Sequence, residues 1–151
     1  MALLPPSTNA RYRGAPWAAS LLTVVAILTV VPGAIHTFLP DGGAGVIAGI
    51  DLGPCGPVII ALFAWAGATQ IALGLAMLAV SLRYRDLVPL FLALVLLERT
   101  LHALDGWWLK GSASGHHPPE HFAVLVAVPL LAVALRAALR GAGDPYPELR
   151  A

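Results

Sequence analysis

Residues 86–109 read DLVPLFLALVLLERTLHALDGWWL, and this stretch decides the fold. It is long and apolar enough to cross a membrane, yet it carries Glu98 and Arg99 near its middle. A charge at that depth costs roughly 2.5–3.5 kcal/mol on insertion scales, so each of these side chains must have a partner or a function. At helical spacing, Glu98, His102 and Asp105 fall on one face. We expect this face to point into protein or water, because lipid cannot satisfy it.

The composition places the whole chain in the membrane class. Hydrophobic residues make up 58% of the 151 residues and charged residues 11%, and the mean hydropathy is +0.80, outside the range of soluble domains. The formal net charge of +1, without a basic stripe, excludes nucleic acid as a partner. The single cysteine, Cys55, excludes an internal disulfide and a paired-cysteine redox relay. We expect one membrane domain over residues 1–151.

Four apolar stretches predict four transmembrane helices. Their approximate bounds are residues 17–39, 57–82, 87–108 and 121–140. The short connections between them favour an all-α, up-and-down four-helix bundle. Every arginine except Arg99 falls on one side of this arrangement, and Lys110 alone falls on the other. By the positive-inside rule, we expect both termini in the cytoplasm.

The second stretch carries small residues at regular spacing. Alanines recur at every fourth position over the Ala64–Ala76 face, and Gly67 and Gly74 lie seven residues apart. Such stripes let helix backbones approach closely in lipid. We expect the Ala64–Ala76 face to bind a protein partner or a second copy of this chain. Gln70 lies on the side of the two glycines, at the depth of Glu98.

The first candidate ligand-binding site joins Glu98, Arg99 and Gln70 near the middle of the membrane. An intramembrane carboxylate can carry protons or bind a cation, with Arg99 tuning its pKa. A structural ion pair and a hydrogen-bonded glutamine that fix the helix register are the other interpretation. Adjacent positions do not face each other on a helix, so we expect Arg99 to pair with a group other than Glu98.

The second candidate site lies toward the outer surface. His36 and His121 are expected at similar heights, with His102 and Asp105 one and two turns beyond Glu98. If they converge, these side chains can bind zinc, copper or iron, and two of the histidines can bind a haem. Interfacial histidines bonded to backbone, water or Asp105 are the alternative. The chain contains no HExxH, repeated ExxH or CxxCH pattern.

A third group of histidines lies in the HHPPEH segment, residues 116–121. A histidine cluster in a loop can bind metals. However, Pro118 and Pro119 prevent a regular helical presentation of His117 and His121 four residues apart. We therefore expect a solvated loop that turns into the last helix.

Residues 66–106, AGATQIALGLAMLAVSLRYRDLVPLFLALVLLERTLHALDG, carry a family resemblance. They resemble the small four-helix bacterial membrane proteins of the DoxX-like kind, which share a glycine-bearing second helix, a short basic turn and a third helix ending near Asp-Gly. The corresponding residues here are Gly67, Gln70, Gly74, Arg83, Arg85, Arg99, Asp105 and Gly106. The resemblance implies a four-helix bundle and little about activity, and with it we expect the bacterial inner (cytoplasmic) membrane.

The chain shows no recognisable catalytic set, so we expect a non-enzymatic accessory or binding subunit of a larger membrane assembly. One alternative is a binder of a lipophilic ligand or cofactor, such as a quinone, a haem or a metal, in the bundle near Glu98 and His102. Another is a proton-coupled carrier or membrane enzyme in which Glu98 accepts and donates the proton. The sequence does not identify the ligand or cofactor.

Overall fold

The computed structural model describes residues 3–111 and 115–140. The long helices in these ranges are α1 (Pro16–Phe38), α2 (Gly56–Arg83), α3 (Val88–Leu104) and α4 (Pro119–Arg140). The short turns are η1 (Asn9–Arg11), η2 (Gly53–Cys55), η3 (Arg85–Leu87) and the π-helical η4 (Asp105–Leu109). Taken with their flanking turns, all four long helices are long and apolar enough to cross a membrane. The prediction of an all-α protein with four such helices is therefore confirmed for the described residues.

Prolines mark where the helices begin. The first turns of α1, α2 and α3 contain Pro16, Pro57 and Pro89. The backbone N–H groups of a first turn have no intrahelical acceptor, so a proline there costs no hydrogen bond. Pro32 lies inside α1 and Pro129 inside α4, and both helices continue past them. Membrane helices tolerate such interruptions because neighbouring groups satisfy the freed carbonyl.

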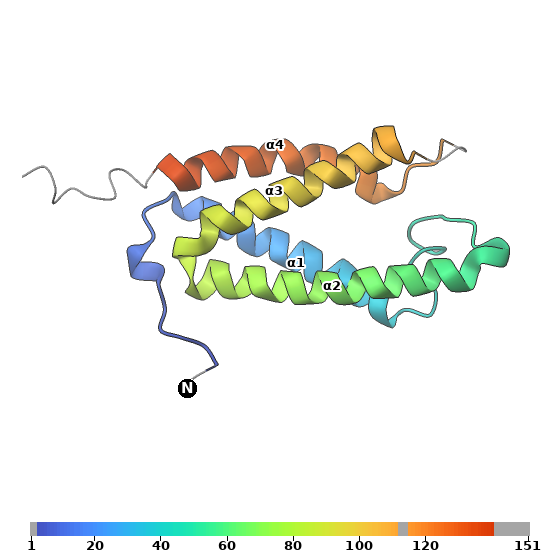
Figure 1. Ribbon diagram of the computed structural model, residues 1–151, viewed down its shortest axis with the longest axis horizontal. Coiled ribbons are helices and arrows are strands. Elements are labelled where there is room, and N and C mark those ends of the chain that lie inside the picture. Colours follow the sequence, from blue (N-terminus) through green and yellow to red (C-terminus); the bar gives the residue numbers. More distant parts are fainter. Residues whose placement is uncertain (1–2, 112–114, 141–151) are drawn as a thin grey trace, which may run out of the picture.

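Successive helices run in alternating directions and associate as two pairs (Figure 1). The most extensive contacts join α1 to α2 and α3 to α4. α1 also contacts both α4 and α3, whereas α2 and α3 contact each other little. α2 is therefore held mainly by α1.

The main apolar core gathers at one end of the bundle. It combines the first half of α1, the last part of α2, the first half of α3 and the last part of α4. Its residues are Ala18, Ala19, Leu22, Ala26, Met77, Val80, Val88, Leu92, Val95, Leu131, Ala134 and Ala138. Because the helices alternate in direction, these segments lie together beside the turn that joins α2 to α3 (Figure 1). The polar groups of α3, from Glu98 onward, lie toward the opposite end.

The segment before α1 closes the core end. Asn9 Nδ2 donates to the Leu82 carbonyl at 2.7 Å, which satisfies one of the last carbonyls of α2. Arg11 pairs with Asp86 at 2.9 Å, next to the turn between α2 and α3. Both contacts lie at the core end of the bundle and hold the segment that enters α1.

Glycines set the distance between α1 and α2. A Cβ added to Gly67 would lie 2.6 Å from the Gly33 carbonyl oxygen and 2.7 Å from Thr37 Oγ1. A Cβ added to Gly74 would lie 2.5 Å from Val30 Cγ2. Cβ atoms do not come this close to other atoms, so the two helices meet at this distance only because these positions are glycine. The glycine face of α2 is thus used inside the chain.

We predict that Gly67→Val forces α1 and α2 apart and lowers the free energy of unfolding by about 1–3 kcal/mol, the usual cost of overpacking. Ala66→Val is the matched control, because Ala66 is the preceding residue, is exposed and lies off the Ala64–Ala76 face. Its effect should stay within about 0.5 kcal/mol. Thermal unfolding of both variants in the same detergent measures the difference. Equal melting temperatures would contradict the close approach at Gly67.

Candidate functional site

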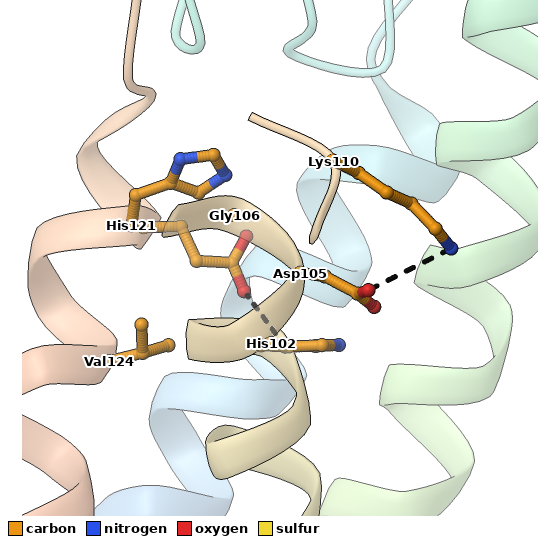
Figure 2. Close-up of a pocket in the computed structure, with 7 residues that line it drawn as sticks. His102, Asp105, Gly106, Lys110, His121 and Val124 are labelled. Carbon is orange, nitrogen blue, oxygen red and sulfur yellow. Dashed lines mark ion pairs between the residues drawn. The ribbon is translucent and has the colours of Figure 1, made fainter. Parts of the chain in front are cut away.

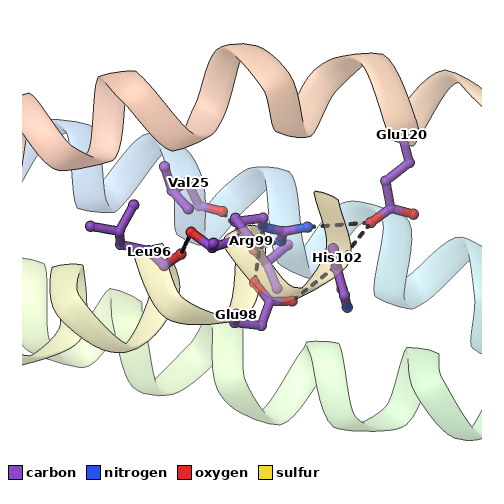
Figure 3. Close-up of polar contacts among 8 residues, drawn as sticks. Val25, Leu96, Glu98, Arg99, His102 and Glu120 are labelled. Carbon is purple, nitrogen blue, oxygen red and sulfur yellow. Dashed lines mark hydrogen bonds and ion pairs between the residues drawn. The ribbon is translucent and has the colours of Figure 1, made fainter. Parts of the chain in front are cut away.

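The polar groups of α3 form an ionic network with α1 and α4 (Figure 3). Arg99 Nη1 lies 3.3 Å from Glu120 Oε1 in the first turn of α4, and Arg99 Nη2 donates to Thr29 Oγ1 of α1 at 3.4 Å. Arg99 Nε lies 3.1 Å from Glu98 Oε2. His102 Nδ1 lies 3.4 Å from Glu98 Oε1 and 3.8 Å from Glu120 Oε1. One guanidinium group therefore links three helices.

As expected, Arg99 pairs with a group other than Glu98, namely Glu120, but it also lies within ion-pair distance of its neighbour Glu98. Neighbouring residues leave a helix about 100° apart. The arginine side chain is long enough for its Nε to pass the Glu98 carboxylate while its end groups reach Glu120 and Thr29. The sequence did not identify Glu120 and Thr29 as members of the network. An acidic residue in a first helical turn and a threonine in an apolar span are common, so only the packing of the helices brings them to Arg99.

The network is shielded at its centre and open at its edge. The Arg99 side chain is 14% exposed, whereas the side chains of Glu98, His102 and Glu120 are 32%, 44% and 48% exposed. Glu98 lies near the middle of the 25-residue stretch Arg85–Leu109. Exposure of ionised groups at that depth is costly unless water, a ligand or another chain covers them.

The charges of the network do not cancel when the imidazole is neutral. Glu98 and Glu120 then carry two negative charges and Arg99 one positive charge. This excess of carboxylates over guanidinium groups favours a cation beside the cluster. Glu98 Oε2 is buried and accepts no hydrogen bond from residues 3–111 and 115–140, because its contact with Arg99 Nε is an ion pair without hydrogen-bond geometry.

Gln70 is not joined to the network by a hydrogen bond within the described part of the chain. Its Oε1 is buried without a donor there. The side chain packs beside Gly33, where a Cβ on the glycine would lie 3.0 Å from Gln70 Cβ. The structure therefore places Gln70 at the contact between α1 and α2.

A pocket of about 250 Å³ opens beside the network, between the end of α3 and the start of α4 (Figure 2). It is lined by His102, Asp105, Gly106, Lys110, Glu120, His121 and Val124. Lys110 Nζ lies 3.8 Å from Asp105 Oδ1. His102 and Glu120 belong both to the pocket and to the ionic network. A ligand in the pocket would therefore contact His102, which lies against Glu98.

The three histidines predicted as metal ligands have different neighbours. His36 Nδ1 lies 2.6 Å from the Gly42 carbonyl oxygen, and its ring packs edge-on against Phe63 at 5.0 Å. His102 faces two glutamates, whereas His121 faces His117. Among the described residues, no group of three or more histidine, cysteine, aspartate or glutamate side chains is arranged to hold a metal ion. The structure does not assemble the predicted three-histidine site.

His117 and His121 come together in spite of the prolines between them. α4 begins at Pro119, and the His121 N–H donates to the Pro118 carbonyl at 2.9 Å. His117 therefore precedes the helix, as expected, but the turn carries its ring back to His121. The two Nδ1 atoms lie 3.1 Å apart. The sequence alone indicated a solvated loop and did not predict this pair.

Asp41 organises the glycine-rich segment between α1 and α2. Its carboxylate accepts hydrogen bonds from the backbone N–H groups of Val46 and Gly43, both at 2.8 Å, and of Gly45 at 3.1 Å. These donors, with Val46 the strongest, lower the pKa of Asp41 because they stabilise the charged form. The support that they give the loop is therefore present above the ordinary aspartate pKa and is lost as the pH falls through the lowered value.

Fold and site together define a helical membrane protein with four candidate transmembrane helices. Only 11% to 33% of the residues in the apolar windows of these helices are buried, so most of their side chains face outward, as contact with lipid requires. Comparisons with protein-family models, with curated proteins and with solved structures found no match to this chain.

We predict that Arg99→Gln destabilises the protein by about 1–3 kcal/mol. This lies below the ~3–5 kcal/mol for breaking a buried pair, because both glutamates are partly exposed. Removing Glu98 as well, in an Arg99→Gln/Glu98→Gln variant, should restore part of the loss. Arg136→Gln is the control, since Arg136 is exposed and makes no ion pair within residues 3–111 and 115–140. Thermal unfolding in detergent would contradict the network if Arg99→Gln and Arg136→Gln melted alike.

Proposed function

We propose that this protein is a non-enzymatic accessory or binding subunit of a larger assembly in the bacterial cytoplasmic membrane. The observation that supports this best is the half-exposed edge of the ionic network, where His102 and Glu98 are 44% and 32% exposed in the single chain. Both residues belong to a helix that is apolar enough to cross the membrane, and lipid offers such groups no hydrogen bond. A partner that contributes polypeptide or polar groups would cover this edge in the membrane.

The Ala64–Ala76 face of α2 offers a second surface for such a partner. Ala68, Ala72 and Ala76 are exposed, and Trp65 beside them is 74% exposed. Since the glycine face of the same helix packs on α1, the alanine face is left for contacts outside the chain. Small side chains let a further helix approach closely in lipid, where dispersion contacts drive helix association. We propose that a partner helix or a second copy of this chain packs here.

The distribution of arginines supports an up-and-down topology with both termini in the cytoplasm. The core end of the bundle carries the basic residues Arg11, Arg13, Arg83, Arg85, Arg136 and Arg140. The opposite end carries Lys110, while Arg150 lies outside the described residues. By the positive-inside rule the core end faces the cytoplasm. The resemblance of residues 66–106 to DoxX-like bacterial proteins supports the same location.

Disulfide cross-linking in native membranes tests the partner face. In a Cys55→Ser background, we predict that Ala72→Cys forms a cross-linked dimer or an adduct with a partner chain on oxidation. Val133→Cys is the control, because Val133 is 59% exposed on α4 and lies away from the alanine face. It should cross-link at least 10-fold less. Equal cross-linking of the two variants, or a clean monomer with no adduct, would contradict the proposal.

A second candidate function is the binding of a lipophilic ligand or cofactor, such as a quinone, a haem or a metal, near Glu98 and His102. The pocket of about 250 Å³ beside His102 favours it, as does the buried Glu98 Oε2, which lacks a hydrogen-bond donor in the described residues. A ligand in this pocket would contact His102, whose Nδ1 lies 3.4 Å from Glu98 Oε1. An absorption spectrum, elemental analysis and solvent extraction of the purified protein distinguish this function from the first.

A proton-coupled carrier or membrane enzyme ranks below these two functions. The position of His102 Nδ1 between Glu98 and Glu120 supports it, because an imidazole can pass a proton between two carboxylates. However, four helices leave little room for alternating access within one chain. This function requires that Glu98→Gln abolish activity while leaving the fold intact.

A further inference from the structure

The imidazole pair of His117 and His121 belongs to neither the ionic network nor the predicted three-histidine site. Their Nδ1 atoms lie 3.1 Å apart, and the ring centroids are 5.4 Å apart at an interplanar angle of 60°. Nitrogen atoms at this separation either share one proton in an N–H···N hydrogen bond or bind a common metal ion. The choice between these states depends on what the surroundings favour.

Contacts from η4 and α4 fix both rings before any ligand arrives. Trp107 stacks on His117 with centroids 4.3 Å apart and planes 15° from parallel. The same indole donates from Nε1 to the His121 carbonyl at 2.9 Å. Gly106 lies directly against the other side of His121, where an added Cβ would come within 3.0 Å of ring atoms Cε1 and Nε2 (Figure 2). The Cε1–Nε2 edge of His121 thus lies beside the Gly106 backbone, and its Nδ1 faces that of His117.

We propose that His117 and His121 form a binding site for a first-row divalent transition metal ion, with Cu(II) bound most tightly and Zn(II) more weakly. Bonds of ~2.0–2.1 Å from a metal ion to both Nδ1 atoms would subtend ~95–102° across the 3.1 Å separation, between roughly 90° for tetragonal copper and roughly 109° for tetrahedral zinc. Neutral imidazole suits both ions, and copper leads the affinity order for such ligands.

The charges around the pair favour a cation. His121 lines the pocket together with Asp105 and Glu120, and the positive charge there is that of Lys110, which lies 3.8 Å from Asp105. Because the protein supplies two nitrogen ligands, the remaining coordination positions are filled by water or by small ligands in the pocket. The site is thus of the open, exchangeable kind and not a closed structural site. It does not rest on the proposed accessory role, and neither requires the other.

Metal titration of the full-length protein, in detergent and without a polyhistidine tag, tests this inference. Cu(II) quenches nearby indoles, and Trp107 lies in van der Waals contact with His117, so fluorescence should fall to a plateau at one ion per chain. Zn(II) should compete for the same site. The apparent affinity should also fall as the pH is lowered, because protons compete with the metal ion for the imidazole nitrogens.

Matched histidine variants locate the site. We expect His117→Gln and His121→Gln each to weaken Cu(II) binding at least 10-fold. His116→Gln should stay within two-fold of the unmodified protein, because His116 Nε2 contacts the Ala48 carbonyl at 2.8 Å. His117 precedes α4, so His117→Gln should keep the melting temperature, which confirms that the fold is intact. The absence of saturable one-ion binding, or equal binding by His116→Gln and His117→Gln, would overturn the inference.

Discussion

The guanidinium of Arg99 is the interaction on which the polar half of this bundle depends. It lies in a helix that is apolar enough to cross a membrane, is only 14% exposed, and reaches Glu98, Glu120 and Thr29 at once. Each charge placed at the centre of a membrane helix costs roughly 2.5–3.5 kcal/mol, so Glu98 and Arg99 without partners would oppose insertion. Because one cation faces two carboxylates and a hydroxyl, the cost of burying each group is offset by contacts from three different helices.

The two ends of the bundle are therefore held together by different interactions. At the end with most of the arginines, alanine, leucine and valine side chains from all four helices form the main core. At the other end the helices are joined by ion pairs, by a pocket and by the histidine pair next to Trp107. The last turns of α2 contribute to the core. Its earlier turns pack closely on α1 at Gly67 and Gly74. Its alanine face and the edge of the network are left for contacts outside the single chain.

Much of the fold follows from the sequence because apolar length and proline position are local properties. The four predicted spans agree with the observed helices to within a few residues, and the glycines of α2 do mark a close helix contact. The site was less predictable, because its members come from different helices. Glu120 and Thr29 acquire their role only when α4 and α1 pack beside Arg99. The turn at Pro118 likewise brings His117 and His121 together, although Pro118 and Pro119 exclude the regular helical spacing that would place both on one face.

The measurement that tests the central claim most directly is the oxygen accessibility of spin labels on α3 in lipid bilayers. The claim is that the polar face of this helix meets protein or water, while its other face meets lipid. Labels would be attached at His102→Cys and Leu101→Cys in a Cys55→Ser background. These adjacent positions have comparable exposure, 44% for the His102 side chain and 51% for Leu101. We expect oxygen collisions to be several-fold fewer at position 102 than at position 101, because oxygen concentrates in hydrocarbon. Equal oxygen collision rates at the two positions would show that the charged face lies in lipid and would contradict the account.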